Sequence, residues 1–147
     1  SGFDLLHPQI QRWVRQQGWS RLRDVQEQAI AAICGSDEDV LISAATAAGK
    51  TEAAFLPLLG SSAARVQPGI SILYVAPLKA LINDQFRRLE DLCDMLELPL
   101  VRWHGDAPQG PKTKIIRAPA GGAYHPGINR GNAVAAIRNC RSAFWGA

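Results

Sequence analysis

The feature that most constrains the fold of this chain is a run of small residues between an apolar segment and a helical one. The apolar segment is Val40-Leu41-Ile42-Ser43, which predicts a short buried strand, and residues 50–59 predict a helix. Between and into them runs Ala44-Ala45-Thr46-Ala47-Ala48-Gly49-Lys50-Thr51. Small residues let successive backbone N–H groups close around an anion, and the helix N-terminus adds the positive end of its dipole. The pattern therefore predicts a loop that binds the phosphates of a nucleotide.

Two side chains at the end of this loop have the chemistry that nucleotide phosphates require. Lys50 is a point charge within reach of β- and γ-phosphates, and the Thr51 hydroxyl is a ligand for Mg²⁺. The motif is a relaxed one, because Ala44 stands where a glycine usually begins it, and Ala47 and Ala48 stand where more glycine is expected. A strand, turn and helix without a ligand is the competing interpretation, which the combination of loop, lysine and helix disfavours.

Helical and strand-like segments alternate along the chain. The predicted helices beyond the loop are residues 8–17, 24–33 and 77–96, and the further predicted strands are residues 70–76 and 98–103. A capping box between Asp24 and Glu27 begins the second helix, and Gly60-Ser61-Ser62 predicts a loop. The alternation indicates an α/β fold with a parallel sheet flanked by helices.

The composition excludes several classes of protein. Among 147 residues, 47% are hydrophobic and 20% charged, which is enough apolar material for a core and too little charge for a disordered segment. No apolar run approaches the roughly 20 residues of a membrane span, and no basic-then-apolar leader opens the sequence. The three cysteines are odd in number and far apart, which argues against a disulfide framework or a zinc site. We expect a reducing, cytoplasmic setting and no membrane partner.

The net charge of +3 is unevenly placed. Residues 1–106 hold ten Lys and Arg and all thirteen acids, whereas residues 107–147 hold six bases and no acid. Residues 119–147 are rich in Gly, Pro, Asn and Arg and predict an irregular tail, in which residues 133–137 are the only helical hint. One function class therefore remains open on charge alone: a non-catalytic nucleic-acid-binding module that uses this basic tail.

Four short motifs occur in a telling order. They are Gln26; Ala44–Thr51 with the following Glu52-Ala53-Ala54-Phe55-Leu56-Pro57; Ala76-Pro77-Leu78-Lys79-Ala80-Leu81-Ile82-Asn83-Asp84-Gln85; and Trp103-His104-Gly105-Asp106. Together they resemble the Q motif, motif I, motif Ia and the Gly-Asp element of superfamily II DEAD/DEAH-box helicases, with wording closest to the large helicase-related (Lhr-like) group. The resemblance covers roughly residues 6–120 and implies that residues 1–120 are a partial N-terminal RecA-like ATP-binding domain.

The resemblance implies two sets of site residues. The ATP and Mg²⁺ site that it implies comprises Gln26, Ala44, Thr46, Gly49, Lys50 and Thr51, with Thr51 as the metal ligand. The nucleic-acid site that it implies comprises Pro77, Leu78, Lys79, Ala80, Gly105 and Asp106. Within these sets Gln26 is expected to hydrogen-bond the adenine edge, and the alternative for it is a solvated polar residue on a helix. The alternative for Lys79 is a surface lysine at an ordinary strand-to-helix turn.

Two elements that helicase catalysis needs are not in this sequence. No acid follows Asp106, so there is no acidic motif II, and the length leaves no room for a second RecA-like lobe. We therefore expect the ATP-binding and nucleic-acid-binding part of an ATP-dependent helicase, a fragment that does not catalyse hydrolysis alone, with no obligate protein partner. A small P-loop kinase is a weaker alternative, since it would need an acceptor lid and a downstream acid.

Residues 121–147 depart from the family pattern, in which a strand ending in Thr-Pro-Glu-Ser would follow. When codons for Gly121 to Ala133 are read from their second base, a permitted choice of third bases gives Gly-Val-Leu-Ile-Thr-Pro-Glu-Ser-Ile-Glu-Ala-Met. This alternative sequence predicts a strand, followed by the expected motif and the start of a helix. The sequence therefore favours a change of reading frame near residues 120–122, and a native basic tail is the alternative.

Overall fold

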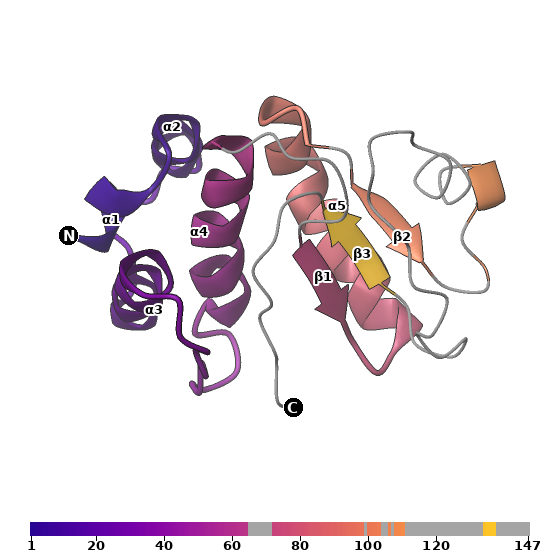
Figure 1. Ribbon diagram of the computed structural model, residues 1–147, viewed down its shortest axis with the longest axis horizontal. Coiled ribbons are helices and arrows are strands. Elements are labelled where there is room, and N and C mark those ends of the chain that lie inside the picture. Colours follow the sequence, from indigo (N-terminus) through magenta and orange to yellow (C-terminus); the bar gives the residue numbers. More distant parts are fainter. Residues whose placement is uncertain (65–71, 99, 104–105, 107, 111–133, 138–147) are drawn as a thin grey trace. The chain divides into compact units, whose positions relative to one another are not determined.

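The computed structural model describes residues 1–64, 72–98, 100–103, 106, 108–110 and 134–137 (Figure 1). These residues form two compact units, of which the first contains the described residues up to Ala64 and the second those from Ile72 onward. Each unit has its own buried residues, so each is described separately.

The first unit is helical. Its helices are α1 (Gly2–Leu5), α2 (Pro8–Gln16), α3 (Asp24–Gly35) and α4 (Lys50–Ala64). Pro8 begins α2, where its missing N–H costs nothing, and His7 Nδ1 accepts a hydrogen bond from the Gln9 N–H. The fully buried side chains that hold these helices together include Ile10, Val14, Ile30, Leu56 and Leu59. The helices predicted over residues 8–17 and 24–33 are confirmed.

Helix α4 is longer than the sequence predicts. The loop expected at residues 60–62 is wrong, because the helix continues to Ala64. Residues 53–60 are all buried, and a Cβ on Gly60 would lie 3.0 Å from the Cβ of His7 and 3.3 Å from Cδ1 of Ile10. Gly60 therefore marks a close packing contact within the helix rather than its end, since tertiary burial outweighs the weak helix propensity of glycine.

The strand predicted at residues 40–43 is also wrong. Residues 39–45 belong to no helix or strand, and Leu41 is 81% exposed. An apolar run becomes a strand only where a neighbouring strand can bond its backbone. In the first unit's described residues no strand is present to pair with it.

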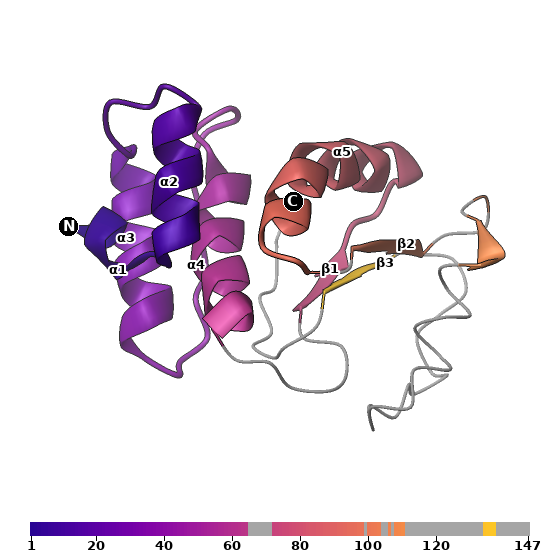
Figure 2. The ribbon, with the colours of Figure 1, turned by 90° about the horizontal axis from the view of Figure 1, so that it is seen from above.

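The second unit contains three strands and one long helix. The strands β1 (Ile72–Val75), β2 (Val101–Trp103) and β3 (Val134–Ile137) form a sheet in the order β1-β3-β2. Helix α5 (Lys79–Met95) covers one face of this sheet (Figures 1 and 2). The unit is therefore a three-stranded sheet with one helix on its face.

The pairing in this sheet is antiparallel, so a parallel sheet is not confirmed. Strand β3 pairs antiparallel with β1, placing Ile72 opposite Ile137, and antiparallel with β2, placing Val101 opposite Ala136. Because β3 lies between them, β1 and β2 run in the same direction without bonding each other. The helical hint at residues 133–137 is wrong, since this segment satisfies its backbone groups on both neighbours. The other residues of the predicted irregular tail lie outside the described residues.

Helix α5 has the amphipathic pattern that its sequence predicts. Its buried residues recur every three or four positions and are Ile82, Gln85, Leu89, Leu92 and Cys93. Burial raises the pKa of the Cys93 thiol to about 12, and the nearby Asp94 carboxylate adds to the shift. This cysteine is therefore a neutral core residue, whereas Cys34 is exposed.

Candidate nucleotide-binding site

The loop of residues 44–49 leads directly into the N-terminus of α4. The Ala48 N–H donates to the Ala45 carbonyl over 3.2 Å, and the Ala53 N–H donates to the Gly49 carbonyl over 3.0 Å, which begins the helix. Gly49 has φ +86°, in the left-handed region that glycine enters without steric cost. The loop therefore makes a tight turn at the point where the helix begins.

The Lys50 side chain folds back into this loop. Its ammonium donates to the Ala44 carbonyl and, over 3.1 Å, to the Ala45 carbonyl. A cation on a flexible stem that donates to loop carbonyls can exchange them for phosphate oxygens. Thr51 is partly buried in the first turn of α4, and Thr46 is exposed in the loop.

Gln26 contacts the loop although 23 residues separate it from Gly49. Its side chain is 3% exposed, so a solvated polar residue on a helix surface is the wrong interpretation. The Gln26 Oε1 accepts from the Arg23 N–H over 3.0 Å, and its Nε2 donates to the Gly49 carbonyl over 3.4 Å. A Cβ on Gly49 would lie 2.5 Å from that Nε2. Each polar atom of the amide retains capacity for one more hydrogen bond, which an adenine edge requires.

Arg23 also contacts the loop, and the sequence analysis did not select it. It is the N-cap of α3, and its Nη1 donates to the Ala47 carbonyl. The capping box predicted for Asp24 and Glu27 is wrong, because Gln26 at the third helical position bonds the Arg23 backbone instead. The Glu27 carboxylate accepts from the Gly2 N–H and, over 2.9 Å, from the Ser1 hydroxyl. The sequence carries no local signal for this contact, because 24 residues separate Arg23 from Ala47.

The Ala47 backbone is the least ordinary part of the loop. Its φ of +62° places an L-residue in the left-handed region, at a cost of roughly 1–2 kcal/mol. Glycine, which was expected near this position, would not carry that cost. The loop therefore holds a conformation that its own sequence disfavours.

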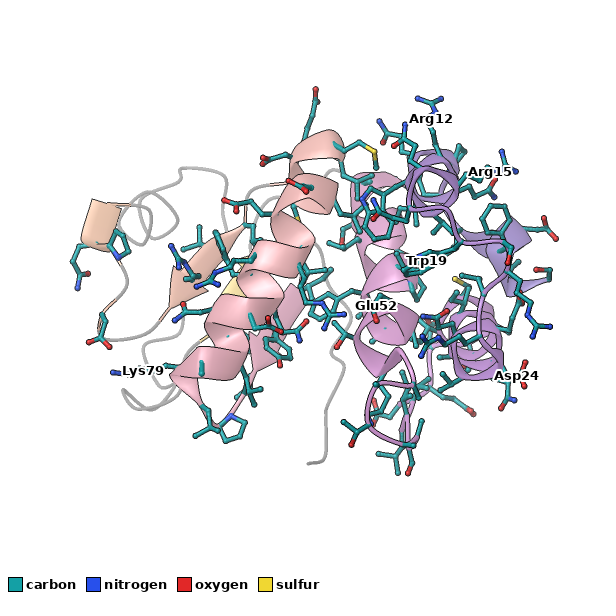
Figure 3. All side chains as sticks on the ribbon, turned by 180° about the vertical axis from the view of Figure 1, so that it is seen from behind. Arg12, Arg15, Trp19, Asp24, Glu52 and Lys79 are labelled. Carbon is teal, nitrogen blue, oxygen red and sulfur yellow. The ribbon has the colours of Figure 1, made fainter. Side chains whose placement is uncertain are left out.

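Residues 77–80 connect β1 to α5 in the second unit. Leu78 is the N-cap and is 61% exposed, and no described side chain caps the helix. The first turn also contains no acid, so its N–H groups and the positive end of the helix dipole face no negative side chain of their own turn. Lys79 projects from this end of α5 (Figure 3). The geometry suits an anion such as a backbone phosphate.

The structure brings Lys79 and Asp106 together. Lys79 Nζ lies 2.7 Å from Asp106 Oδ2, and both side chains are exposed. Two of the expected nucleic-acid residues, 27 positions apart, therefore form an ion pair. Gly105, expected beside them, lies outside the described residues.

Tyr74 of β1 has a raised pKa, first because of its burial and second because of the Asp84 carboxylate, so it stays neutral.

Within the described ranges, no three His, Cys, Asp or Glu side chains come together as a metal-binding group. Among the same residues, no helix has the length and apolar character needed to cross a membrane.

A small-residue loop that leads into a helix N-terminus, with a lysine folded into it, is typical of P-loop nucleotide-binding proteins. The family model for DEAD/DEAH box helicases matches residues 23–123. The chain belongs to the DEAD/DEAH box helicase family. Members of this family use ATP with Mg²⁺ and act on nucleic acids.

Relatives with curated names support the same assignment. The chain is similar to the ATP-dependent helicase Lhr-Core of Saccharolobus solfataricus, with 35% identity over 92 residues, which are 59% of this chain and 10% of that protein. It is 36% identical over 95 residues to the ATP-dependent helicase Lhr-Core protein 2 of Thermococcus barophilus, covering 60% of this chain and 11% of that protein. It is also 39% identical over 85 residues to the human activating signal cointegrator 1 complex subunit 3. The match covers 51% of this chain and 4% of that protein. The chain thus matches about a tenth or less of these relatives' lengths, and no solved structure matches it.

Proposed function

We propose that this chain binds Mg·ATP at the residue 44–51 loop and single-stranded nucleic acid at the start of α5, as the ATP-binding part of an ATP-dependent helicase. The observation that carries the proposal is the contact between Gln26 and Gly49. Gln26 has an amide that can both donate and accept hydrogen bonds, as recognition of an adenine edge requires. The contact places this amide beside a loop with the chemistry of a phosphate site. A calorimetric titration with Mg·ATP tests it, with saturable binding of one nucleotide per chain as the expected result.

The loop residues suit the three chemical parts of Mg·ATP. Lys50 would exchange the Ala44 and Ala45 carbonyls for phosphate oxygens, and the N-terminus of α4 would add its dipole. Thr51 would offer its hydroxyl to Mg²⁺. Gln26 would use its remaining donor and acceptor on the adenine edge. In this chain the bound Mg²⁺ would serve to neutralise phosphate charge.

Binding without turnover is the activity that this sequence supports. Phosphoryl transfer depends on preorganised charges around the phosphate, including an acid that orients the metal and the attacking water. No acid follows Asp106 in the sequence, so the residues of this chain supply no such group beyond the motifs described. We propose that hydrolysis in the wider family mechanism is completed by residues that these 147 positions do not include.

The nucleic-acid surface gives a testable role to the Lys79–Asp106 pair. Replacing Lys79 with alanine should weaken binding of a labelled single-stranded oligonucleotide about 3- to 10-fold at low salt and lower the salt slope by about one. Replacing Asp106 with asparagine should strengthen binding about 2- to 5-fold, because it removes the carboxylate that competes with phosphate for Lys79. Fluorescence anisotropy across a salt series measures both effects.

Two further variants make this experiment decisive. Arg12→Ala, which removes an exposed charge on α2, should leave oligonucleotide binding within about twofold. Replacing Arg130, Arg138 and Arg141 with glutamine tests the charge of the basic tail while keeping the residues of β3 in the chain. If these substitutions abolished binding while Lys79→Ala had no effect, the tail module would be the better account of nucleic-acid binding.

We also propose that the reading frame changes near residues 120–122. The family match ends at residue 123, and the shifted frame offers Thr-Pro-Glu-Ser where the family pattern calls for it. First and second codon bases are largely fixed by the amino acids, so most sequences would not permit that motif. Sequencing the gene through this region should show codons compatible with the shifted text and an acidic helicase motif downstream in that frame. An intact frame with other codons, or no such motif in either frame, would contradict the proposal.

A further inference from the structure

The residue 44–49 loop contains a conformation that needs support from elsewhere. Ala47 has φ +62°, and Glu97 is the other non-glycine residue in the described part with a positive φ. Ala47 lies in the loop itself, three residues before Lys50, where a Cβ is unfavourable. The loop therefore requires an interaction that holds this residue in place.

Arg23 supplies an interaction at that residue. Its Nη1 donates to the Ala47 carbonyl, and its own backbone N–H is held by Gln26 Oε1 over 3.0 Å. The Gln26 Nε2 in turn bonds the Gly49 carbonyl. Arg23 is thus anchored at the start of α3 and reaches the loop two residues before the carbonyl that Gln26 holds.

Among the residues that the structure describes, no acid forms an ion pair with Arg23. The ion pairs there include those of the Ser1 amino group with Asp4, Lys79 with Asp106, and Arg88 with Asp84. An arginine fork donates several hydrogen bonds in one plane and suits a backbone carbonyl as well as a carboxylate. The Arg23 guanidinium therefore has the loop carbonyl as its hydrogen-bond partner rather than a charge partner.

We propose that Arg23 is a positioning residue for the phosphate loop, which holds Ala47 in its left-handed conformation and so replaces the glycine that such a loop would use. The inference rests on the proposed function only where it concerns ATP. It assigns Arg23 an effect on the phosphate end of the nucleotide through the backbone, without contact with the nucleotide itself.

A double-mutant cycle tests this role, because glycine adopts a positive φ without needing the arginine. Arg23→Ala should weaken Mg·ATP binding about 5- to 10-fold in the natural chain and less than about twofold when Ala47→Gly is also present. The affinity of Ala47→Gly alone is the reference for the second background. Arg23→Lys keeps a charged donor and should retain affinity within about threefold. Adenosine affinity should be the same in all variants, since it has no phosphate.

Two results would overturn the inference. Equal weakening by Arg23→Ala with and without Ala47→Gly would mean that Arg23 contacts the nucleotide directly. No weakening in either background would mean that Arg23 has no role in the loop. Both results leave the proposed ATP binding itself intact.

A second measurement separates this inference from the proposed function. If the natural chain binds no Mg·ATP, the proposed function fails, and melting temperatures of the four ligand-free proteins then decide the role of Arg23. A decrease caused by Arg23→Ala that disappears in the presence of Ala47→Gly supports the inference. Equal decreases in both backgrounds, or no decrease in either, overturn it.

Discussion

Replacing Lys50 with alanine is expected to weaken Mg·ATP binding by about 100-fold or more. In the structure its ammonium is held by the Ala44 and Ala45 carbonyls, inside the loop where phosphates would lie. Truncating one partner of a close charge pair costs about 2–5 kcal/mol, and each 1.4 kcal/mol is about tenfold in affinity. Fluorescence titration with an ATP analogue measures the loss.

The matched control for this variant is Lys79→Ala. It also removes one partly exposed lysine, but from the start of α5 rather than from the loop. ATP affinity should stay within about twofold of the natural chain, because Lys79 belongs to no part of the loop and its exposed charge is screened by solvent and salt. Equal ATP affinity of the Lys50 variant and the natural chain would show that the loop is not a phosphate site.

Gly49→Ala is the second change with a large expected effect. The new Cβ would lie 2.5 Å from Gln26 Nε2, and φ +86° is unfavourable for alanine. We expect a loss of stability of about 2–3 kcal/mol, from roughly 1–2 kcal/mol of backbone strain and about 1 kcal/mol from the lost Gln26 hydrogen bond. ATP affinity should fall at least about tenfold, because the turn into α4 is displaced. Urea unfolding and ATP titration measure the two losses.

Gly35→Ala provides the control for an added methyl group. Gly35 is the last residue of α3, and a Cβ built there meets no atom within 4 Å. Its effect on unfolding free energy should stay within about 0.5 kcal/mol. If the two alanine variants were equally stable, the contact between Gln26 and the loop would not be part of the folded structure.

The sequence predicted the elements whose signals are local. Helix α2 begins at a proline, and α5 has apolar residues at helical spacing, so both are visible in the sequence. Residues 50–59 were predicted as a helix after a small-residue loop, and α4 begins at Lys50 as expected. The ordered motifs likewise identified the family that the comparisons then showed.

The features that were missed depend on partners far away in the sequence. The strand expected at residues 40–43 lacks a neighbouring strand, and residues 134–137 become a strand because two others flank them. Gly60 packs on His7, which no local pattern reveals. The bond from Arg23 to the Ala47 carbonyl joins two residues whose types alone give no reason to pair them.

The candidate site residues differ in how far the sequence alone could predict them. The composition of the loop and its place before a helix predicted Gly49, Lys50 and Thr51 as phosphate-site residues without help from the family resemblance. Gln26 was selected only by family resemblance, and its burial against Gly49 is a feature of the folded chain. For Lys79, the motif predicted an exposed cation at a helix start, but the Asp106 partner required the structure.

The basic pI of about 9.0 contributes little to the nucleic-acid proposal. The nucleic-acid proposal depends on Lys79 and Asp106. Both lie within residues 1–106, where acids outnumber bases. The excess of bases lies in residues 107–147, much of which a change of reading frame would explain. A local pairing of Lys79 with Asp106 is therefore better support than net charge.

The most direct test of the central claim, ATP binding at the residue 44–51 loop, is an equilibrium titration with adenosine, AMP, ADP and ATP in the presence of Mg²⁺. Calorimetry on the natural chain should show affinity that rises with each added phosphate, saturates at one ATP per chain, and depends on Lys50. A phosphate-release assay on the same samples should show no ATP hydrolysis by the natural chain above the level of the Lys50→Ala variant. Equal affinity for adenosine and ATP, or no ATP binding up to millimolar concentrations, would contradict the account.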